Sequence, residues 1–354
     1  MDEFGLIETY FSKKTPSRPD VILGIGDDAA LLRVPSEKLL VAAIDTLVAG
    51  VHFPIHTHPF DIGYKALAVN LSDLAAMGAE PAWMTLALTL PYADTEWLEG
   101  FSDGLLQLAH QFNLQLVGGD TTRGSLTITV QVNGFVPSNQ ALCRHGAKIG
   151  DKIYVSGTVG DAGLGLQVAL EKRELPDAAK QFVLQRLNRP TPRIELGLLL
   201  RDLASSAIDI SDGLLADLGH IINRSGVGAH IIADQLPMSS TLRECVSIEE
   251  AQTLALTAGD DYELCFTVSP QNEMALIEKL NTHDMDCCCI GEIEATHSVR
   301  VSGFSGNINQ TGFRHFAKRH NLERERLNIL AKLMDQSERL WPISRALNEK
   351  IVLL

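Results

Sequence analysis

The hydrophobic positions of this chain follow two spacings, and each spacing predicts a different element. Short runs that are apolar throughout, or that alternate with polar residues, predict strands. Segments with apolar residues three and four positions apart predict helices. In the first part of the chain we expect strands at 39–44, 83–90, 114–117 and 126–136, and helices at 61–77 and 95–112.

The same pattern returns after residue 150. We expect strands at 152–156, 207–210, 230–233, 262–268 and 287–290, and helices at 164–170, 213–224, 249–257 and 270–281. Strands that alternate with helices are typical of layered folds in which helices cover a sheet. The pattern therefore predicts an α/β (or α+β) fold.

The length of the chain bears on its domain organisation. A chain of 354 residues exceeds what one hydrophobic core normally supports, so two domains are expected. The stretch 137–150 is rich in Pro, Ser, Asn and Gly and is typical of a linker. We therefore expect one domain over 1–137 and a second over 138–316. Residues 317–354 are charged and helical in pattern, and we expect a helical C-terminal extension there.

Composition excludes several functions. Hydrophobic residues make up 45% and charged residues 21%, which is typical of a globular protein. The formal net charge of −14 disfavours binding to nucleic acid or to an anionic membrane surface. No apolar run is long enough for a membrane helix, and the N-terminus lacks the pattern of a secretory signal. The 6 cysteines lack zinc-site spacing, which favours reduced, buried thiols.

The most informative feature is the placement of aspartates beside Gly or Ser, at the junctions between expected strands and helices. Each one alone is better explained as a turn or cap residue, as we expect for Asp61 at the start of its helix. Grouped carboxylates repel one another, by about 4 kcal/mol for two charges 4 Å apart at an effective dielectric near 20. A group of them therefore requires raised pKa values or bound cations, and Mg²⁺ prefers such oxygen ligands. The aspartates in question are Asp27, Asp28, Asp45, Asp73, Asp120, Asp209 and Asp212.

Other motifs are weaker. The glycines of 157–165 suggest a turn whose amides could hold a phosphate at a helix N-terminus, although a plain turn with tight packing explains them equally well. The chain has no P-loop motif, and the glycine spacing differs from that of a Rossmann turn. His52, His56 and His58 lie near one another, but an ordinary polar loop accounts for them.

Taken in order, several strings resemble the thiamine-monophosphate kinase family over residues 4–316. They are GIGDDAALL from Gly24, DTLVAGVHF from Asp45, YKALAVNLSDLAAMGAEPAW from Tyr64, VGGDTTRG from Val117, AIDISDGLLADLGH from Ala207, GDDYELCFT from Gly259 and GFRHF from Gly312. The resemblance implies a two-domain fold shared with aminoimidazole ribonucleotide synthetase and selenophosphate synthetase. It also implies a cytoplasmic homodimer joined through its N-terminal domains.

The implied reaction makes thiamine diphosphate and ADP from thiamine monophosphate and ATP, with several Mg²⁺ ions, as a step of thiamine biosynthesis. The family pattern places metal ligands at Asp28, Asp45, Asp73, Asp120, Asp209 and Asp212. It places nucleotide contacts at Gly119, Asp120, Arg144 and Ser211, and substrate contacts at His52, Asp260 and Phe313. We expect Asp120, Asp212 and Arg144 to act on the transferred phosphoryl group.

Four positions depart from the family pattern. Ala43 and Ile44 stand where the family commonly has Ser-Thr, so a metal contact there would use backbone oxygen. Asp260 stands where Glu is frequent, and Phe313 where Tyr or Trp is common. The aromatic ring and the acid suit the fixed positive charge of a thiazolium.

The implied chemistry is simple. A phosphate monoester with a second pKa near 6 is largely ionised at pH 7, so in-line transfer requires alignment and charge neutralisation rather than a general base. Three alternatives remain: another ATP-using enzyme of the same fold, a non-catalytic metal- or nucleotide-binding subunit, and a two-metal phosphohydrolase.

Overall fold

The structure is a computed structural model that describes residues 3–12 and 14–306. Its N-terminal part is built on a four-stranded sheet in the order β3 (Lys38–Val48), β6 (Thr127–Pro137), β4 (Glu80–Leu90) and β5 (Gln115–Arg123). Strand β6 is antiparallel to both of its neighbours, whereas β4 and β5 are parallel. Before the sheet come α1 (Glu3–Ile7), the π-helical turn Glu8–Ser12 and the small hairpin β1 (Val21–Leu23) and β2 (Leu31–Leu32).

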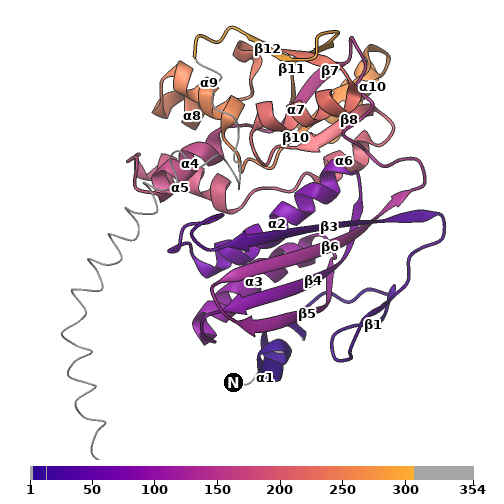
Figure 1. The fold of residues 1–354 in the computed structure, drawn as a ribbon, viewed down its shortest axis with the longest axis vertical. Coiled ribbons are helices and arrows are strands. Elements are labelled where there is room, and N and C mark those ends of the chain that lie inside the picture. Colours follow the sequence, from indigo (N-terminus) through magenta and orange to yellow (C-terminus); the bar gives the residue numbers. More distant parts are fainter. Residues whose placement is uncertain (1–2, 13, 307–354) are drawn as a thin grey trace, which may run out of the picture. The chain divides into compact units, whose positions relative to one another are not determined.

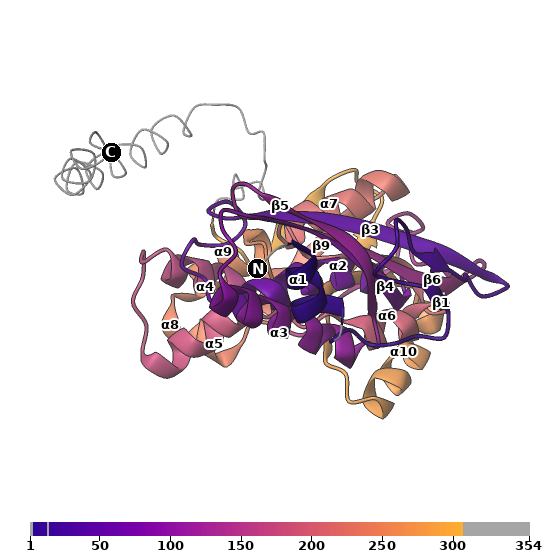
Figure 2. The ribbon, with the colours of Figure 1, turned by 90° about the horizontal axis from the view of Figure 1, so that it is seen from below.

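Helices α2 (Pro59–Ala76) and α3 (Thr95–Gln111) cover one face of this sheet (Figures 1 and 2). The alternation along the strands explains which face they cover. Ile128, Val130 and Val132 of β6 are buried beneath the helices, while the residues between them point to the other face. That other face carries exposed apolar side chains, including Ile44 at 62% and Leu40 at 48% exposure.

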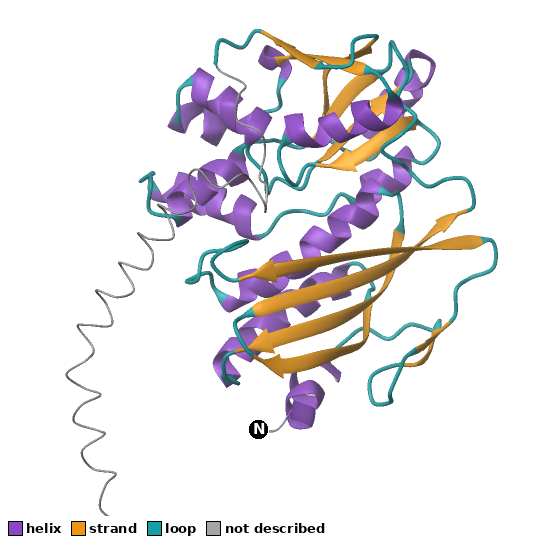
Figure 3. Cartoon of the chain, viewed as in Figure 1, coloured by secondary structure: helices purple, strands orange, loops and turns teal. Residues whose placement is uncertain are grey.

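The C-terminal part contains a six-stranded mixed sheet (Figure 3). Its order is β12 (Val299–Ser302), β9 (Gly228–Ile232), β11 (Cys287–Glu294), β7 (Lys152–Ser156), β10 (Leu264–Val268) and β8 (Ala204–Asp209). The helices are α4 (Asp161–Ala169), α5 (Asp177–Asn188), α6 (Ile194–Leu200), α7 (Leu214–Ser225), α8 (Ser240–Cys245), α9 (Ile248–Thr257) and α10 (Pro270–Thr282), and a short 3-10 turn spans Ala233–Gln235.

Both faces of this sheet are buried. Ile153, Val155 and Cys265 belong to a core that includes residues of α4, α7 and α9. Tyr154 and Phe266 point to the opposite face and join the core of the N-terminal sheet. Helix α2 packs against α6 and β8, so a helix of the N-terminal part contacts the edge strand of the C-terminal sheet.

The predicted α/β fold is confirmed, and several local predictions need correction. Asp45 lies inside β3 and does not end a strand, because the strand continues to Val48. Gly118, Gly119 and Asp120 are also strand residues, since β5 pairs with β4 as far as Arg123. Asp61 is not the cap of α2: His58 accepts the amide hydrogen of Phe60 and caps the helix.

The prediction for the end of α2 holds. Gly78 adopts a φ of 61° directly after α2, as expected for a residue that ends a helix in the left-handed region. Residues 138–151, all of them described, contain neither helix nor strand. Within the described residues, no helix is long and apolar enough to cross a membrane. The predicted extension 317–354 and Phe313 lie outside the described residues.

Candidate active site

An acidic group forms where α2 contacts the ends of β3 and β8. Asp45 comes from β3, Asp73 from α2 and Asp209 from the last position of β8. Ser72, the neighbour of Asp73, donates a hydrogen bond of 2.8 Å to Asp209 Oδ2. Since Ser72 is 0% exposed and Asp209 5% exposed, this bond fixes α2 to β8 at the site itself.

The electrostatics show that these carboxylates are close together. Burial, and then the charges of Asp209 and Asp45, raise the pKa of Asp73 to about 8. Burial also raises the pKa of Asp209 to about 6, against the hydrogen bond from Ser72. Burial, with Asp212 nearby, raises the pKa of Asp45. The arrangement therefore disfavours three simultaneous negative charges unless a cation compensates them.

The turn between β8 and α7 supplies the next acidic residue. Gly213 adopts a φ of 116° there, which suits glycine. The backbone N–H groups of Ser211, Asp212 and Gly213 all donate to Asp217 Oδ2, at 3.0, 3.0 and 3.1 Å. Asp217 thus fixes the turn from inside α7. The sequence does not single out Asp217, because acids are common in the first turn of a helix.

The loop Gly259–Glu263 approaches from β10. The Asp260 carboxylate lies 2.7 Å from the ammonium of Lys65 on α2, and that ammonium makes no further hydrogen bond among the described residues. Burial, and then the charges of Asp260 and Asp45, raise the pKa of Tyr262 well above its usual value. Asp260 therefore contacts α2 through Lys65, and Tyr262 lies beside the acidic group.

Two predicted contact residues also lie beside this group. The exposed Arg144 is close enough that its charge lowers the pKa of Asp73 and of Asp209, in opposition to the effect of burial. His52 Nδ1 lies 3.0 Å from Val48 N and accepts its hydrogen, so Nε2 carries the ring proton in the neutral form. His52 also holds down the pKa of Asp45.

The remaining predicted acids lie elsewhere. Asp28, Gly119 and Asp120 line a cavity of about 880 Å³ that is also bounded by the π-helical turn and residues 25–30. Asp120 is on β5 and Asp45 on β3, the two opposite edges of the four-stranded sheet. Three strand spacings separate these edges, or about 14 Å. One chain therefore divides the predicted metal ligands between two places.

Two of the positions that depart from the family pattern, Ala43 and Ile44, are on β3. Ile44 points to the open face of the sheet and Ala43 to the helix side. Within the described part of the chain, β3 pairs with β6 alone, so every second residue of β3 directs its carbonyl away from the sheet. Of the Ala43 and Ile44 carbonyl groups, one is therefore not hydrogen-bonded to β6. Only a carbonyl of that kind could act as a backbone ligand to a metal ion.

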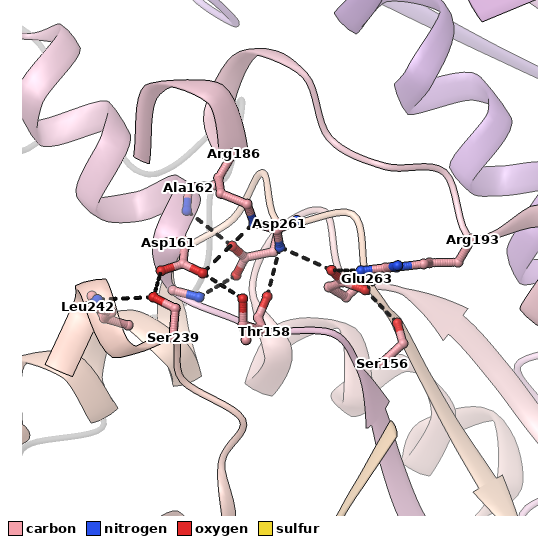
Figure 4. Close-up of polar contacts among 11 residues, drawn as sticks. Ser156, Thr158, Asp161, Ala162, Arg186, Arg193, Ser239, Leu242, Asp261 and Glu263 are labelled. Carbon is pink, nitrogen blue, oxygen red and sulfur yellow. Dashed lines mark hydrogen bonds and ion pairs between the residues drawn. The ribbon is translucent and has the colours of Figure 1, made fainter. Parts of the chain in front are cut away.

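The glycine-rich turn before α4 is not an open phosphate cradle. Gly160 N and Ala162 N donate to the two carboxylate oxygens of Asp261, at 2.7 and 3.2 Å (Figure 4). An anion of the protein itself occupies the helix N-terminus. The phosphate interpretation of this turn is therefore wrong, and tight packing explains its glycines: a Cβ at Gly165 would lie 2.2 Å from Val183 O.

The residues present are of the type that binds Mg²⁺, but they do not form a complete metal site by themselves. Asp73 and Asp209 are acids with raised pKa values, and carboxylate oxygen is the ligand that Mg²⁺ prefers. Within the described part of this one chain, no three His, Cys, Asp or Glu side chains converge as a metal site. Mg²⁺ usually takes one or two carboxylates and completes its shell with water and substrate phosphate.

Comparison with known proteins adds the decisive observation. Residues 26–136 match the family described as AIR synthase related protein, N-terminal domain, and 148–303 match its C-terminal domain. The thiamine-monophosphate kinase of Escherichia coli (strain K12) is 51% identical over 320 residues, which span 89% of this chain and 98% of that protein. The chain belongs to the thiamine-monophosphate kinase family.

Solved structures agree with this family assignment. A crystal structure of thiamine-monophosphate kinase from Stenotrophomonas maltophilia K279a superposes with a TM-score of 0.80 at 49% identity, covering 86% of this chain and 98% of that one. A structure described as AaThiL complexed with AMPPCP and TMP has a TM-score of 0.71 at 33% identity, covering 89% and 97%. The resemblance proposed from the sequence is confirmed.

Proposed function

We propose that this member of the thiamine-monophosphate kinase family transfers the γ-phosphoryl group of ATP to the phosphate of thiamine monophosphate. The observation that carries the proposal is the acidic group of Asp45, Asp73 and Asp209, whose pKa values are all raised. Two anionic substrates approach such a group only if cations neutralise it. A solved relative described with AMPPCP and TMP supports the choice of both substrates.

We propose that Mg²⁺ is held by Asp28, Asp45, Asp73, Asp120, Asp209 and Asp212, with backbone oxygen from Ala43 or Ile44. When bound, the ions supply charge neutralisation and alignment of the two phosphate groups. The protein's own part is to hold these carboxylates rigidly. Ser72 does so for Asp209, and Asp217 does so for the turn that carries Asp212.

Other residues have roles that follow from their positions. Arg144 would add a planar cation over the transferred group, beside Asp120 and Asp212. Gly119, Asp120 and Ser211 would contact the nucleotide. His52 would donate from Nε2 to substrate oxygen, and Asp260 and Phe313 would receive the cationic thiazolium.

A homodimer would complete the site. Asp28 and Asp120 lie at the β5 edge, and the acidic group lies at the β3 edge about 14 Å away. If two sheets pair through their open faces around a two-fold axis, β5 of one protomer lies beside β3 of its partner. The exposed Leu40 and Ile44 on β3 support burial of that face. This pairing would unite the ligands that one chain separates.

The proposal includes an organisation and a location. The division into domains 1–137 and 138–316, with an extension at 317–354, follows the end of β6 at Pro137. The N-terminal domain would bind metal and ATP and form the dimer. A cytoplasmic location suits the thiols, none of which forms a disulfide among the described residues.

One reaction tests the function. Purified protein is mixed with ATP, Mg²⁺ and thiamine monophosphate, and the thiamine species are separated by chromatography. We expect thiamine diphosphate and ADP in equal amounts, and neither product when Mg²⁺ is replaced by a chelator. Formation of ADP without thiamine diphosphate would assign another acceptor, and release of inorganic phosphate without an acceptor would assign a hydrolase.

A further inference from the structure

The loop Gly259–Glu263 directs its side chains in two opposite directions. Asp260 reaches Lys65 of α2, and Tyr262 lies beside the acidic group. Asp261 and Glu263 point away from it into the C-terminal part, and each is only 1% exposed. Two fully buried acids next to a substrate-facing loop need an explanation, because burying a charge is costly unless it is paired.

The contacts of Asp261 fasten the loop to α4. Its two carboxylate oxygens accept the N–H groups of Gly160 and Ala162 at the first turn of that helix. Gly160 has a φ of 93°, and a Cβ there would lie 2.8 Å from Ala255 N. Only glycine lets this turn approach Ala255 so closely. The backbone N–H groups of the turn then fix the position of the Asp261 carboxylate.

The contacts of Glu263 fasten the other end of the loop. Arg193 donates from Nε and Nη2 to its two oxygens, both at 2.6 Å (Figure 4). Arg186 Nη2 donates to the same carboxylate at 3.0 Å, and Ser156 Oγ donates at 2.6 Å. Two guanidinium groups and a hydroxyl thus converge on one buried acid, and a bidentate pair with arginine defines orientation as well as distance.

The conformation of the loop requires such fastening. Asp260 has a φ of 70° and Tyr262 a φ of 51°, and residues with a side chain adopt left-handed values only when the surroundings enforce them. The same backbone is joined to the β8–α7 turn: Asp260 N donates to Ser211 O at 2.9 Å and Tyr262 N to Ile210 O at 2.8 Å. A shift of the loop would therefore move the turn that bears Asp212.

We propose that Asp261 and Glu263 are positioning residues for the phosphoryl transfer. From behind the site they hold the left-handed loop that presents Asp260, and through its backbone they hold the turn of Ser211 and Asp212. Arg186 and Arg193 are the cations that make this possible. The kinetic test of this inference rests on the proposed function, whereas its test by hydrogen exchange does not.

The alternative is that the network only stabilises the fold. A matched control separates the two ideas. Asp151 is an equally buried acid, 2% exposed, that accepts hydrogen bonds from Lys148 N and Ser205 Oγ. It precedes β7 next to the far end of β10, since Lys152 pairs with Val268. Removing its charge disturbs the same sheet without touching the loop.

The experiment compares Glu263→Gln with Asp151→Asn in the full-length protein. Thermal unfolding, kcat and KM for each substrate, and hydrogen exchange of the peptide covering 259–264 are measured for both. We expect Glu263→Gln to lower kcat/KM for thiamine monophosphate about 10- to 100-fold, as small misplacements of reacting groups do. We also expect faster exchange at Asp260 and Tyr262. Asp151→Asn should lose a comparable amount of thermal stability. Its kcat/KM and its loop exchange should nevertheless stay close to those of the wild type.

The variant Arg193→Lys extends the test if Glu263→Gln does not fold. It keeps the buried charge paired but replaces the bidentate contact with a single one. We expect an intermediate loss of kcat/KM and an intermediate rise in exchange. Unchanged exchange in the loop, or equal kinetic losses in Asp151→Asn and the loop variants, would overturn the proposal. A wild-type protein that makes no thiamine diphosphate would refute the proposed function, and exchange alone would then decide the positioning role.

Discussion

Lys65 Nζ lies 2.7 Å from Asp260 Oδ1, although one residue is on α2 and the other is on the loop before β10. The lysine side chain is 3% exposed, while that of Asp260 is 28% exposed. The ion pair therefore joins a buried cation to an acid that still reaches solvent. The pair also fixes the orientation of the Asp260 carboxylate.

The first prediction concerns this pair. In Lys65→Met the apolar stem remains and Asp260 loses its fixed orientation, so we expect KM for thiamine monophosphate to rise about tenfold. Stability should change by no more than about 1 kcal/mol, because Asp260 can hydrate. Steady-state kinetics and thermal unfolding measure both. Lys14→Met, which removes an exposed pair with Asp103, is the control and should change neither. An unaltered KM in Lys65→Met would refute this role.

The second prediction concerns Arg144. Its side chain is exposed, so Arg144→Ala should change stability by less than about 0.5 kcal/mol. Loss of a cation that clamps phosphate should lower kcat/KM for ATP about 100-fold. Arg224→Ala, an exposed arginine at the end of α7, should leave the kinetics unchanged. Equal kinetic constants in the two variants would show that Arg144 has no role in catalysis.

The third prediction joins pH to metal. With a chelator present, folded protein retains the Asp73 proton to a pKa of about 8, whereas the unfolded chain releases it near the ordinary value of 3.8. The folded state therefore binds more protons between these values, and this group costs stability as the pH rises through that range. Asp73→Asn escapes the cost.

Denaturant unfolding at pH 5 and pH 8 measures the difference. Relative to wild type, Asp73→Asn should gain about 1–3 kcal/mol from pH 5 to pH 8, less than the full shift because neighbouring carboxylates share the titration. Saturating Mg²⁺ should abolish this gain. Asp103→Asn, which removes an exposed carboxylate, serves as the control for an Asp-to-Asn change at the surface. A gain that Mg²⁺ does not affect would contradict a metal role for Asp73.

The fourth prediction concerns the contact between α2 and α3. A Cβ at Gly104 would lie 2.0 Å from Phe60 O, so Gly104→Ala should destabilise the protein by about 1–3 kcal/mol. At Gly219 in α7, an added Cβ would meet open space among the described residues, so Gly219→Ala should stabilise the protein by about 0.5–1 kcal/mol. Thermal unfolding of the two variants provides the measurement, and a similar effect in both would show that the helices separate easily.

Much of the fold was accessible from the sequence because it depends on local patterns. The apolar run from Leu39 and the alternation after Leu126 identify β3 and β6, and Gly78 identifies the end of α2. Helices α5, α6 and α8 were not predicted, since they are short or weakly periodic and tertiary packing decides them. The strand predicted at 114–117 was too short, because the pairing of Gly118 and Gly119 with β4 outweighs the turn preference of glycine.

The sequence predicts the type of residue that forms the candidate site, but it does not predict how those residues are arranged in space. Sequence position could not show that Asp45 and Asp120 lie at opposite edges of one sheet, because strand order is a property of long-range pairing. It also could not show that Asp261 fills the turn before α4, about a hundred residues earlier in the chain. Acids that stabilise the protein and acids that face a ligand look alike in a string such as GDDYE.

The separation of Asp120 from Asp209 has a consequence for mixtures of two inactive proteins. If each catalytic centre takes Asp120 from one protomer and Asp209 from the other, Asp120→Ala and Asp209→Ala damage opposite halves of every centre. In a mixed dimer, one centre then carries both lesions and the other carries none. After unfolding and refolding together, the two dead variants should recover about a quarter of wild-type turnover, since half of the dimers are mixed and half of their centres are intact. Such complementation between subunits would be absent if each chain carried a whole site.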